Sequence, residues 1–265
     1  MLENLLASLV IFLYVLLTVL FSYRLATGGK GFSKARLLAF ACLILLGHAT
    51  LLYHNLFAGP GLDISFFSVF SLIAWVITLM LVMFAWQEPI ENLAIGILPI
   101  AALAVLLRLT NEHVTLLSHD LSFTLEIHII TSLIAYSILS IAALQSIMLY
   151  IQDMQLHKKH ATGFMRALPP LETMEKLLFR MIGVGFIVLC ISLATGLPYL
   201  GDLLSQHKTV LSIGAWLLFA VLLWGRWKFG WRGRTAIRWT LTGFIFLLLA
   251  YFGSKFVLEI ILQKQ

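Results

Sequence analysis

Residues 207–234 read HKTVLSIGAWLLFAVLLWGRWKFGWRGR, an apolar run with a His-Lys pair at one end and a cluster of Trp and Arg at the other. A helix of about 20 apolar residues crosses the hydrocarbon core of a bilayer. Tryptophan prefers the headgroup zone and arginine the anionic leaflet, so GWRGR indicates the inner boundary of a membrane span. This explanation leaves His207 and Lys208 at the opposite end unaccounted for.

The apolar character extends over the whole chain of 265 residues, of which 61% are hydrophobic and 11% charged. Soluble domains typically carry about 25% charged residues. Lipid admits only helices or closed barrels, and apolar runs this long favour helices. We therefore predict an all-α integral membrane protein, a bundle of about eight transmembrane helices in one polytopic domain over residues 1–265. The expected spans are residues 4–23, 36–57, 65–86, 92–109, 125–150, 178–200, 208–225 and 236–262.

The basic residues predict the orientation of these spans. Fourteen of the 18 Lys and Arg residues lie between spans one and two, five and six, or seven and eight, or within the first three residues of the second span of such a pair. Cytoplasmic loops of membrane proteins are enriched in Lys and Arg. Both termini are therefore expected on the outer side of the membrane. The net charge of +6 has the same origin, so lipid and not nucleic acid is the expected partner.

Ionisable groups inside a span are costly, and each is a functional candidate by default. His48 lies in the second span near mid-depth, and His54, six residues later, points to a different face. His128 stands just inside the outer end of the fifth span. Ser132 and Tyr136 follow four and eight residues on, which predicts a polar line on one helix face.

Two further polar groups stand near the outer ends of the last two spans. His207 and Lys208 open the seventh span, and Lys255 and Glu259 on the eighth have the spacing of an intrahelical ion pair. Neutral imidazole binds zinc, copper and haem iron, but the chain has no HxH, HxxxH or HExxH pattern for a hydrolytic zinc site. Haem needs only one or two axial histidines, apolar walls and cations for its propionates. The alternative is a buried histidine bonded to a neighbouring helix.

Two segments resemble a known family. EIHIITSLIAYSILSIAALQSIMLYIQD (126–153) and HKTVLSIGAWLLFAVLLWGRWKFGWRGRTAIRWTLTGFIFLLLAYFGSKFV (207–257) are similar to the membrane domain of cytochrome c assembly proteins of the CcsA and CcmC type. PPLETMEKLLFR (169–180) and GHATLLY (47–53) resemble the YpjD- and HemX-like branch of that family. The likeness is strongest over residues 125–262.

The resemblance implies a haem-handling protein of the bacterial inner membrane, with haem b as cofactor and both termini periplasmic. It implies that His128 and His48 are axial ligands of the haem iron. The further cofactor-binding residues are Lys208, Tyr136, His207 and His54. Cytochrome c maturation proteins are the implied partners.

One departure from the family limits the implied activity. The segment LPYLGDLLSQH before Lys208 contains no tryptophan, so the family's WWD motif is absent. We therefore expect binding or relay of haem at the outer side, and not cytochrome c synthase catalysis. Two alternatives stay open. One is a HemX-like regulator whose loop 151–177 contacts a soluble enzyme of tetrapyrrole synthesis. The other is a haem-free transporter or structural subunit, in which Pro99, Pro198, Gly183, Gly185 and Gly196 mark packing or hinge points.

Overall fold

The structure, a computed structural model, describes residues 2–29, 31–57, 62–111, 114–117, 122–157, 168–199 and 207–253. Within these ranges eight helical segments are long and apolar enough to cross a membrane, which confirms the predicted all-α architecture. The helices are α1 (Leu2–Ala26), α2 (Lys34–Phe57), α3 (Phe66–Gln87), α4 (Ala94–Thr110), α5 (Phe123–His157), α7 (Leu171–Gly196), α8 (His207–Phe229) and α9 (Arg234–Leu248). Short 3-10 turns η1 (Glu91–Leu93) and η2 (Leu197–Tyr199), the π-helical turn η3 (Leu249–Gly253) and strands β1 (Leu62–Asp63) and β2 (Leu116–Leu117) complete the described elements.

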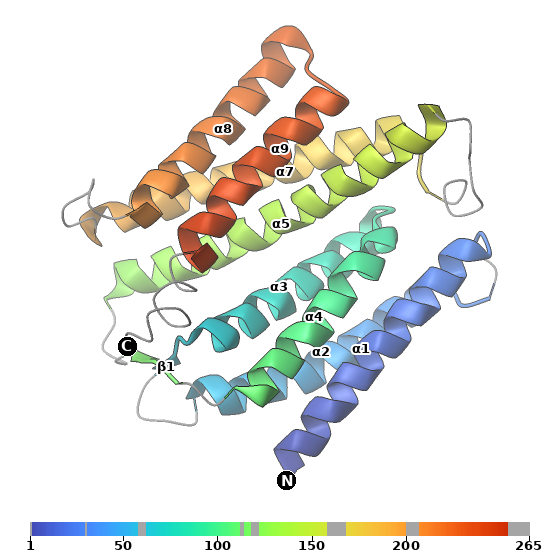
Figure 1. The fold of residues 1–265 in the computed structure, drawn as a ribbon, viewed down its shortest axis with the longest axis vertical. Helices are drawn as coiled ribbons and strands as arrows, with labels where there is room; N and C mark the ends of the chain where they lie inside the picture. The colour runs from blue at the N-terminus through green and yellow to red at the C-terminus, as the bar shows by residue number, and fades with distance from the viewer. Residues whose placement is uncertain are drawn as a thin grey trace. The chain divides into compact units, whose positions relative to one another are not determined.

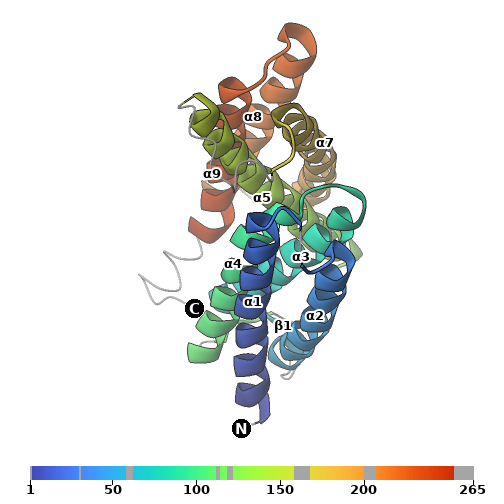
Figure 2. The same ribbon diagram turned by 90° about the vertical axis from the view of Figure 1, so that its right-hand side faces the viewer.

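The helices form two compact units. In the first unit α1 packs on α2, α2 on α3, α3 on α4 and α4 back on α1, so the four helices form a closed ring. The second unit repeats this pattern with α5, α7, α8 and α9, and α5 and α7 share its largest contact. Figure 1 draws the first unit in blue to green and the second in yellow-green to red, and Figure 2 turns both by 90°. Each unit therefore supplies four spans.

The outward faces of the helices are as apolar as their cores. On α1, Tyr14 and Leu17 are fully buried, whereas Phe12, Val15 and Val19 are exposed. A helix that is apolar all round is found in a large core or in a membrane. Because these side chains face outward from the unit, lipid is the medium that accommodates them.

Proline sets the start of α7. Pro169 and Pro170 precede Leu171, and Pro170 occupies the N-cap position with an extended backbone (φ −53°, ψ 143°). Proline disfavours the helical region for the residue before it and lacks an N–H, so a helix starts readily just after it. LETMEKLLFR is therefore the first part of the sixth span, as predicted, and the span begins at Leu171, earlier than residue 178. At the other end Pro198 lies in η2, just beyond the last turn of α7.

The Trp- and Arg-rich cluster at the end of α8 is a tight turn between α8 and α9. Gly230 and Gly233 have positive φ angles of 65° and 56°, a region that glycine adopts without steric cost. The turn is fixed to the second unit by one carboxylate, because Arg226 Nη1 lies 2.8 Å and Arg232 Nε 3.3 Å from Glu175 Oε1. Part of the basic charge that predicts the inner boundary is therefore paired within the protein.

Candidate functional site

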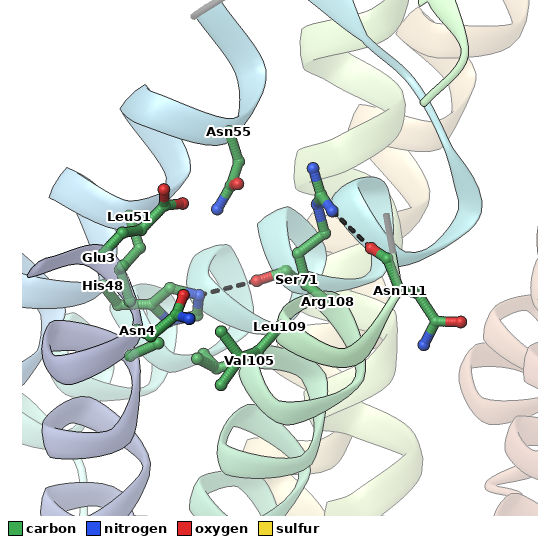
Figure 3. A pocket seen from close by; sticks show the side chains of 11 residues that line it. Glu3, Asn4, His48, Leu51, Asn55, Ser71, Val105, Arg108, Leu109 and Asn111 are labelled. Carbon is green, nitrogen blue, oxygen red and sulfur yellow. Dashed lines mark hydrogen bonds between the residues drawn. The ribbon is translucent and has the colours of Figure 1, made fainter. Parts of the chain in front are cut away.

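A polar cavity of about 170 Å³ lies in the first unit, where α1 and α3 begin and α2 and α4 end. Figure 3 shows its lining side chains. His48 and Ser71 are buried and lie at its inner end, Asn55 and Arg108 are half-buried at its sides, and Glu3 is exposed at its rim. Polar groups are costly inside an apolar bundle, so their convergence makes this cavity a candidate site.

His48 is held at both ring nitrogens. Nδ1 lies 3.0 Å from the Tyr14 hydroxyl and Nε2 lies 2.9 Å from Ser71 Oγ. The histidine and the tyrosine are both fully buried. The imidazole therefore links α1, α2 and α3, and iron ligation through either nitrogen requires one of these hydrogen bonds to break.

Arg108 forms the opposite wall of the cavity. Its Nη1 donates to the backbone oxygen of Asn111 at 2.6 Å, and its Nη2 lies 3.4 Å from Asp63 Oδ2. Its Nε is buried and has no hydrogen-bond partner among the described residues. A guanidinium offers five N–H donors in a fixed plane, and these contacts use two of them.

Asp63 anchors the loops beside this cavity. It ends β1, which pairs antiparallel with β2. Its carboxylate accepts hydrogen bonds from the backbone N–H and the hydroxyl of Ser65, the hydroxyl of Ser68 and the backbone N–H of Thr115. Burial alone raises the pKa of this carboxyl, but these hydrogen bonds outweigh it and hold the pKa below its usual value. Asp63 is therefore an ionised partner for Arg108.

The lowered pKa of Asp63 predicts how stability depends on pH. A carboxyl with a depressed folded-state pKa stabilises the protein above its unfolded pKa of about 3.9. This stabilisation is lost as the pH falls through the lower folded-state pKa. We expect Asp63→Asn to lower the melting temperature at pH 7 and the difference from wild type to shrink below about pH 4. Thermal unfolding of both proteins in detergent from pH 7 to pH 2.5 measures this, and a constant difference would contradict it.

The second unit holds His128 by a single ring nitrogen. Nδ1 lies 2.8 Å from the backbone oxygen of Ser192 on α7. A carbonyl oxygen only accepts, so Nδ1 carries the proton and Nε2 keeps its lone pair in the neutral ring. Nε2 makes no hydrogen bond to a described residue. Metal-ligating histidines commonly donate the other ring N–H to a backbone carbonyl in this way.

The ring of His128 also depends on Gly196 and Ser132. A Cβ atom at Gly196 would lie 2.8 Å from His128 Cε1, so only glycine leaves room for the ring. Ser132 Oγ donates to the backbone oxygen of His128 at 2.6 Å and lies 2.7 Å from Ser192 Oγ. The ends of α5 and α7 are therefore joined around this imidazole.

The predicted polar line on α5 is divided between two neighbours. Tyr136 is buried against α9 and η3, with its ring 5.7 Å from that of Phe244 and 5.6 Å from that of Phe252. His128 and Ser132 instead face α7. Eight residues advance a helix by about 80° beyond two full turns, which is enough to change the neighbour.

The remaining predicted residues stand apart from these groups or outside the described ranges. His54 is exposed near the end of α2, and Lys208 is exposed on the first turn of α8 and makes no ion pair with a described residue. His207 begins α8, but its side chain, Lys255 and Glu259 lie outside the described residues. Part of the loop predicted as a regulatory contact, residues 158–167, also lies outside them.

The prolines and glycines predicted as hinge points have different surroundings. Pro99 lies inside α4, which continues through it as a full span of 20 residues together with η1. A Cβ at Gly185 would meet Leu139 of α5 at 2.7 Å, whereas one at Gly183 would meet nothing within 4 Å. Gly185 therefore marks a close helix crossing, of the kind that small residues permit in membranes.

Sequence reasoning missed Asp63, Ser71 and the role of Arg108. Arg108 is a charged residue in the last turn of an apolar helix, and that position is a sequence signal. Its partner Asp63 lies 45 residues earlier, and Ser71 lies 23 residues from His48. Neither spacing corresponds to a local pattern.

Eight apolar helices with polar groups gathered near their ends define a multi-pass membrane protein. The Cytochrome C assembly protein family matches residues 36–262, and the chain belongs to this family, as its sequence motifs predict. The inner membrane protein YpjD of Escherichia coli strain K12 is 34% identical over 83% of this chain and 86% of its own length.

Other relatives cover less of the chain. An uncharacterized 28.8 kDa protein of Azospirillum brasilense, encoded in the nifR3-like 5′ region, is 36% identical over 52% of this chain and 53% of its own. The cytochrome c biogenesis protein CcsA of Gloeobacter violaceus is 27% identical over 33% of this chain and 28% of its own. No solved structure matches.

His48 and His128 differ in their fit to haem, the group that the family implies. The cavity beside His48 is smaller than the roughly 300–1,000 Å³ of pockets for drug-sized ligands, and both nitrogens of His48 are hydrogen-bonded. His128 has an unshared Nε2 and a fixed ring orientation. Within the described ranges no three His, Cys, Asp or Glu side chains gather around a possible metal ion, but a haem iron needs only one protein ligand. Of these two histidines, His128 fits an iron ligand as packed here.

Proposed function

We propose that this chain binds or relays haem at the outer side of a bacterial inner membrane, with His128 as an axial ligand. The observation that carries the proposal is the hydrogen bond from His128 Nδ1 to the Ser192 carbonyl, which leaves Nε2 as the basic nitrogen. Family membership supports haem over other metal groups, because a relative is named a cytochrome c biogenesis protein. The name of YpjD supports the inner membrane.

The chain's own residues hold and orient the group in this proposal. Haem, when bound, supplies a redox-active iron. His128 supplies a ligand from α5, Ser192 and Gly196 fix its ring, and the exposed ammonium of Lys208 is available to a propionate. His48 is bonded on both sides and serves to join α1, α2 and α3. We assign no bond-breaking step to these residues, and the protein acts as a binding or relay partner of cytochrome c maturation proteins.

The orientation of the helices is part of the proposal. The three loops rich in Lys and Arg support placing both termini outside. The first turns of α5, where His128 lies, then stand near the outer surface. The Trp- and Arg-rich turn between α8 and α9 then lies on the cytoplasmic side.

An absorption spectrum tests the proposal. Protein purified in detergent is titrated with haem b, and the spectrum is recorded before and after reduction with dithionite. We expect a Soret band and sharp reduced α and β bands that saturate at a fixed ratio of haem to protein. A folded protein that shows no saturable Soret band would refute haem binding. That result would favour the alternative in which loop 151–177 contacts a soluble partner.

Gly196→Ala tests whether the orientation of the His128 ring affects haem affinity. The added methyl would lie 2.8 Å from His128 Cε1, so the ring must turn and lose its bond to Ser192. Changes around a metal ligand typically cost about 10–100-fold in metal affinity, and we expect haem affinity to fall by at least about 10-fold. Gly183→Ala on the same helix is the matched control, because its methyl meets nothing within 4 Å. Equal haem titrations of the two variants would contradict this role of Gly196.

A further inference from the structure

One exposed face of α9 joins two arginines to an apolar stripe. Arg234 and Arg238 are exposed near the start of the helix, and Ile245 and Leu248 further along are 53% and 38% exposed. At about 100° per residue, these four side chains lie within an arc of about 80° around the helix axis. The buried residues of α9, among them Thr240, lie on the opposite side. The four exposed residues form what we call the α9 stripe, which is cationic at one end and apolar along the rest.

Both arginines of the α9 stripe have donors that no described residue uses. Arg238 makes no ion pair or hydrogen bond with a described residue. Arg234 Nε lies 3.1 Å from Asp153 Oδ2, and its two Nη groups make no hydrogen bond within the described part of the chain. The two residues are four apart on one helix, so their side chains are neighbours. Planar guanidinium groups match phosphate oxygens in a bidentate geometry, so this pair suits a phosphate group.

The surroundings of this pair carry a net positive charge. No Asp or Glu lies between Asp202 and Glu259 in the sequence. Among the described residues, Glu175 and Asp153 pair with three of the five Arg and Lys side chains within residues 226–238. Three positive charges therefore remain in excess, and they favour an anionic group at this end of α9.

The position and length of the α9 stripe match one leaflet of a bilayer. Trp239, the residue after Arg238, contacts Trp231 with ring centroids 5.4 Å apart, and tryptophan prefers the headgroup zone. Arg238 and Leu248 are about 15 Å apart along the helix axis, which is half of the roughly 30 Å hydrocarbon core. The arginines therefore lie at the depth of headgroups, and Ile245 and Leu248 lie at the depth of acyl chains.

We propose that the α9 stripe binds one anionic glycerophospholipid. The phosphate accepts hydrogen bonds from Arg234 and Arg238, and an acyl chain lies along Ile245 and Leu248. This is a site for one lipid molecule, in addition to the general preference of arginine for an anionic leaflet. A second copy of the chain fits the same face poorly, because its arginines would lie at the same depth and repel. The lipid site does not depend on haem binding by His128.

Native mass spectrometry of the full-length, haem-free protein tests the proposal by counting the lipids that it retains. Protein in detergent is titrated with phosphatidylglycerol, which is anionic, or phosphatidylcholine, which is zwitterionic, with the same acyl chains. We expect the first phosphatidylglycerol to bind at least about 10-fold more tightly than phosphatidylcholine, because hydrogen bonds between charged groups are the strong ones. Equal affinities for the two lipids would overturn the proposal.

Arg238→Gln assigns the lipid to the α9 stripe. Arg238 is exposed and contacts no described partner, so the variant should fold, and we expect its affinity for phosphatidylglycerol to fall at least about 10-fold. Arg36→Gln is the matched control, because Arg36 is exposed in the first turn of α2, on the side of the membrane predicted to be the same, and makes no ion pair with a described residue. Its affinity should match that of wild type. Equal losses in the two variants would indicate general charge attraction and overturn the proposal.

Two further outcomes would assign the α9 stripe to another occupant. Excess inorganic phosphate at constant ionic strength should not displace phosphatidylglycerol, because it has no acyl chain to contact Ile245 and Leu248. Displacement would indicate a site for a free anion and overturn the proposal. The same spectra report the oligomeric state. A dimer that Arg238→Gln converts into a monomer, with unchanged retention of phosphatidylglycerol, would assign the face to a second copy and would also overturn it.

Discussion

His128→Ala should abolish the sharp reduced α and β bands of the haem-loaded protein and weaken haem binding by more than about 100-fold. Loss of a hydrogen-bond partner of a metal ligand typically lowers metal affinity by about 10–100-fold. Loss of the ligand itself should therefore lower haem affinity by more than this. The substitution removes the one described imidazole that has a fixed ring and an unshared nitrogen. Haem titration followed by absorption, before and after reduction, measures the loss.

Two control variants separate ligation from folding. Ser132→Ala removes a hydroxyl that bonds to Ser192 but leaves the imidazole, so the bands should persist. His48→Ala leaves the hydroxyls of Tyr14 and Ser71 without their partner, which should cost about 2 kcal/mol of stability. Its reduced bands should nevertheless match those of wild type. Full retention of the bands in His128→Ala would rule out His128 as the ligand. Their loss in a folded His48→Ala protein would place the ligand in the first unit.

Glu175→Gln should lower the free energy of unfolding by about 2 kcal/mol, because hydrogen bonds to charged groups contribute about 1.5–3 kcal/mol. The Glu175 side chain is 10% exposed and its Oε1 contacts both Arg226 and Arg232. Without it, Arg226 keeps the backbone oxygen of Trp231 at 3.0 Å and the Phe179 ring at 4.5 Å. Both arginines are partly exposed and regain water, which keeps the loss below that of a fully buried pair.

Unfolding in mixed micelles with increasing SDS measures this change. Glu172→Gln is the matched control on the same helix, because Glu172 pairs with Lys176 in an exposed i,i+4 contact. Exposed pairs of this kind contribute little, so this variant should unfold like wild type. Equal destabilisation by the two substitutions would mean that Glu175 does not anchor the turn between α8 and α9.

The spans were predictable because hydropathy reports how each side chain partitions between water and lipid. The run after His207 is such a case, and Pro169 and Pro170 mark the start of α7 through backbone geometry alone. The position of His128 near the first turns of α5 was predictable from the bounds of the apolar run in the same way. These features depend on local sequence, and the structure reproduces them to within a few residues at most boundaries.

The partners of the polar side chains were not predictable in this way. Tyr14 lies 34 residues from His48, and Ser192 lies 64 residues from His128. The choice of neighbouring helix depends on packing between helices. Hydropathy carries no information about that packing. The difference between a histidine bonded at both nitrogens and one with a free nitrogen is set by those distant partners. It decides which of the two fits iron.

The length of α5 has a consequence for what lies outside the lipid. Its 35 residues extend about 52 Å at 1.5 Å per residue, against a hydrocarbon core of about 30 Å. Tilt alone would need more than about 50°, beyond the range of roughly 0–40° found for such helices. About 20 Å of this helix therefore projects beyond the hydrocarbon core. In the proposed orientation Glu126 lies near the outer boundary. The His157 end of the helix then lies in the aqueous phase, where a water-soluble protein can reach it.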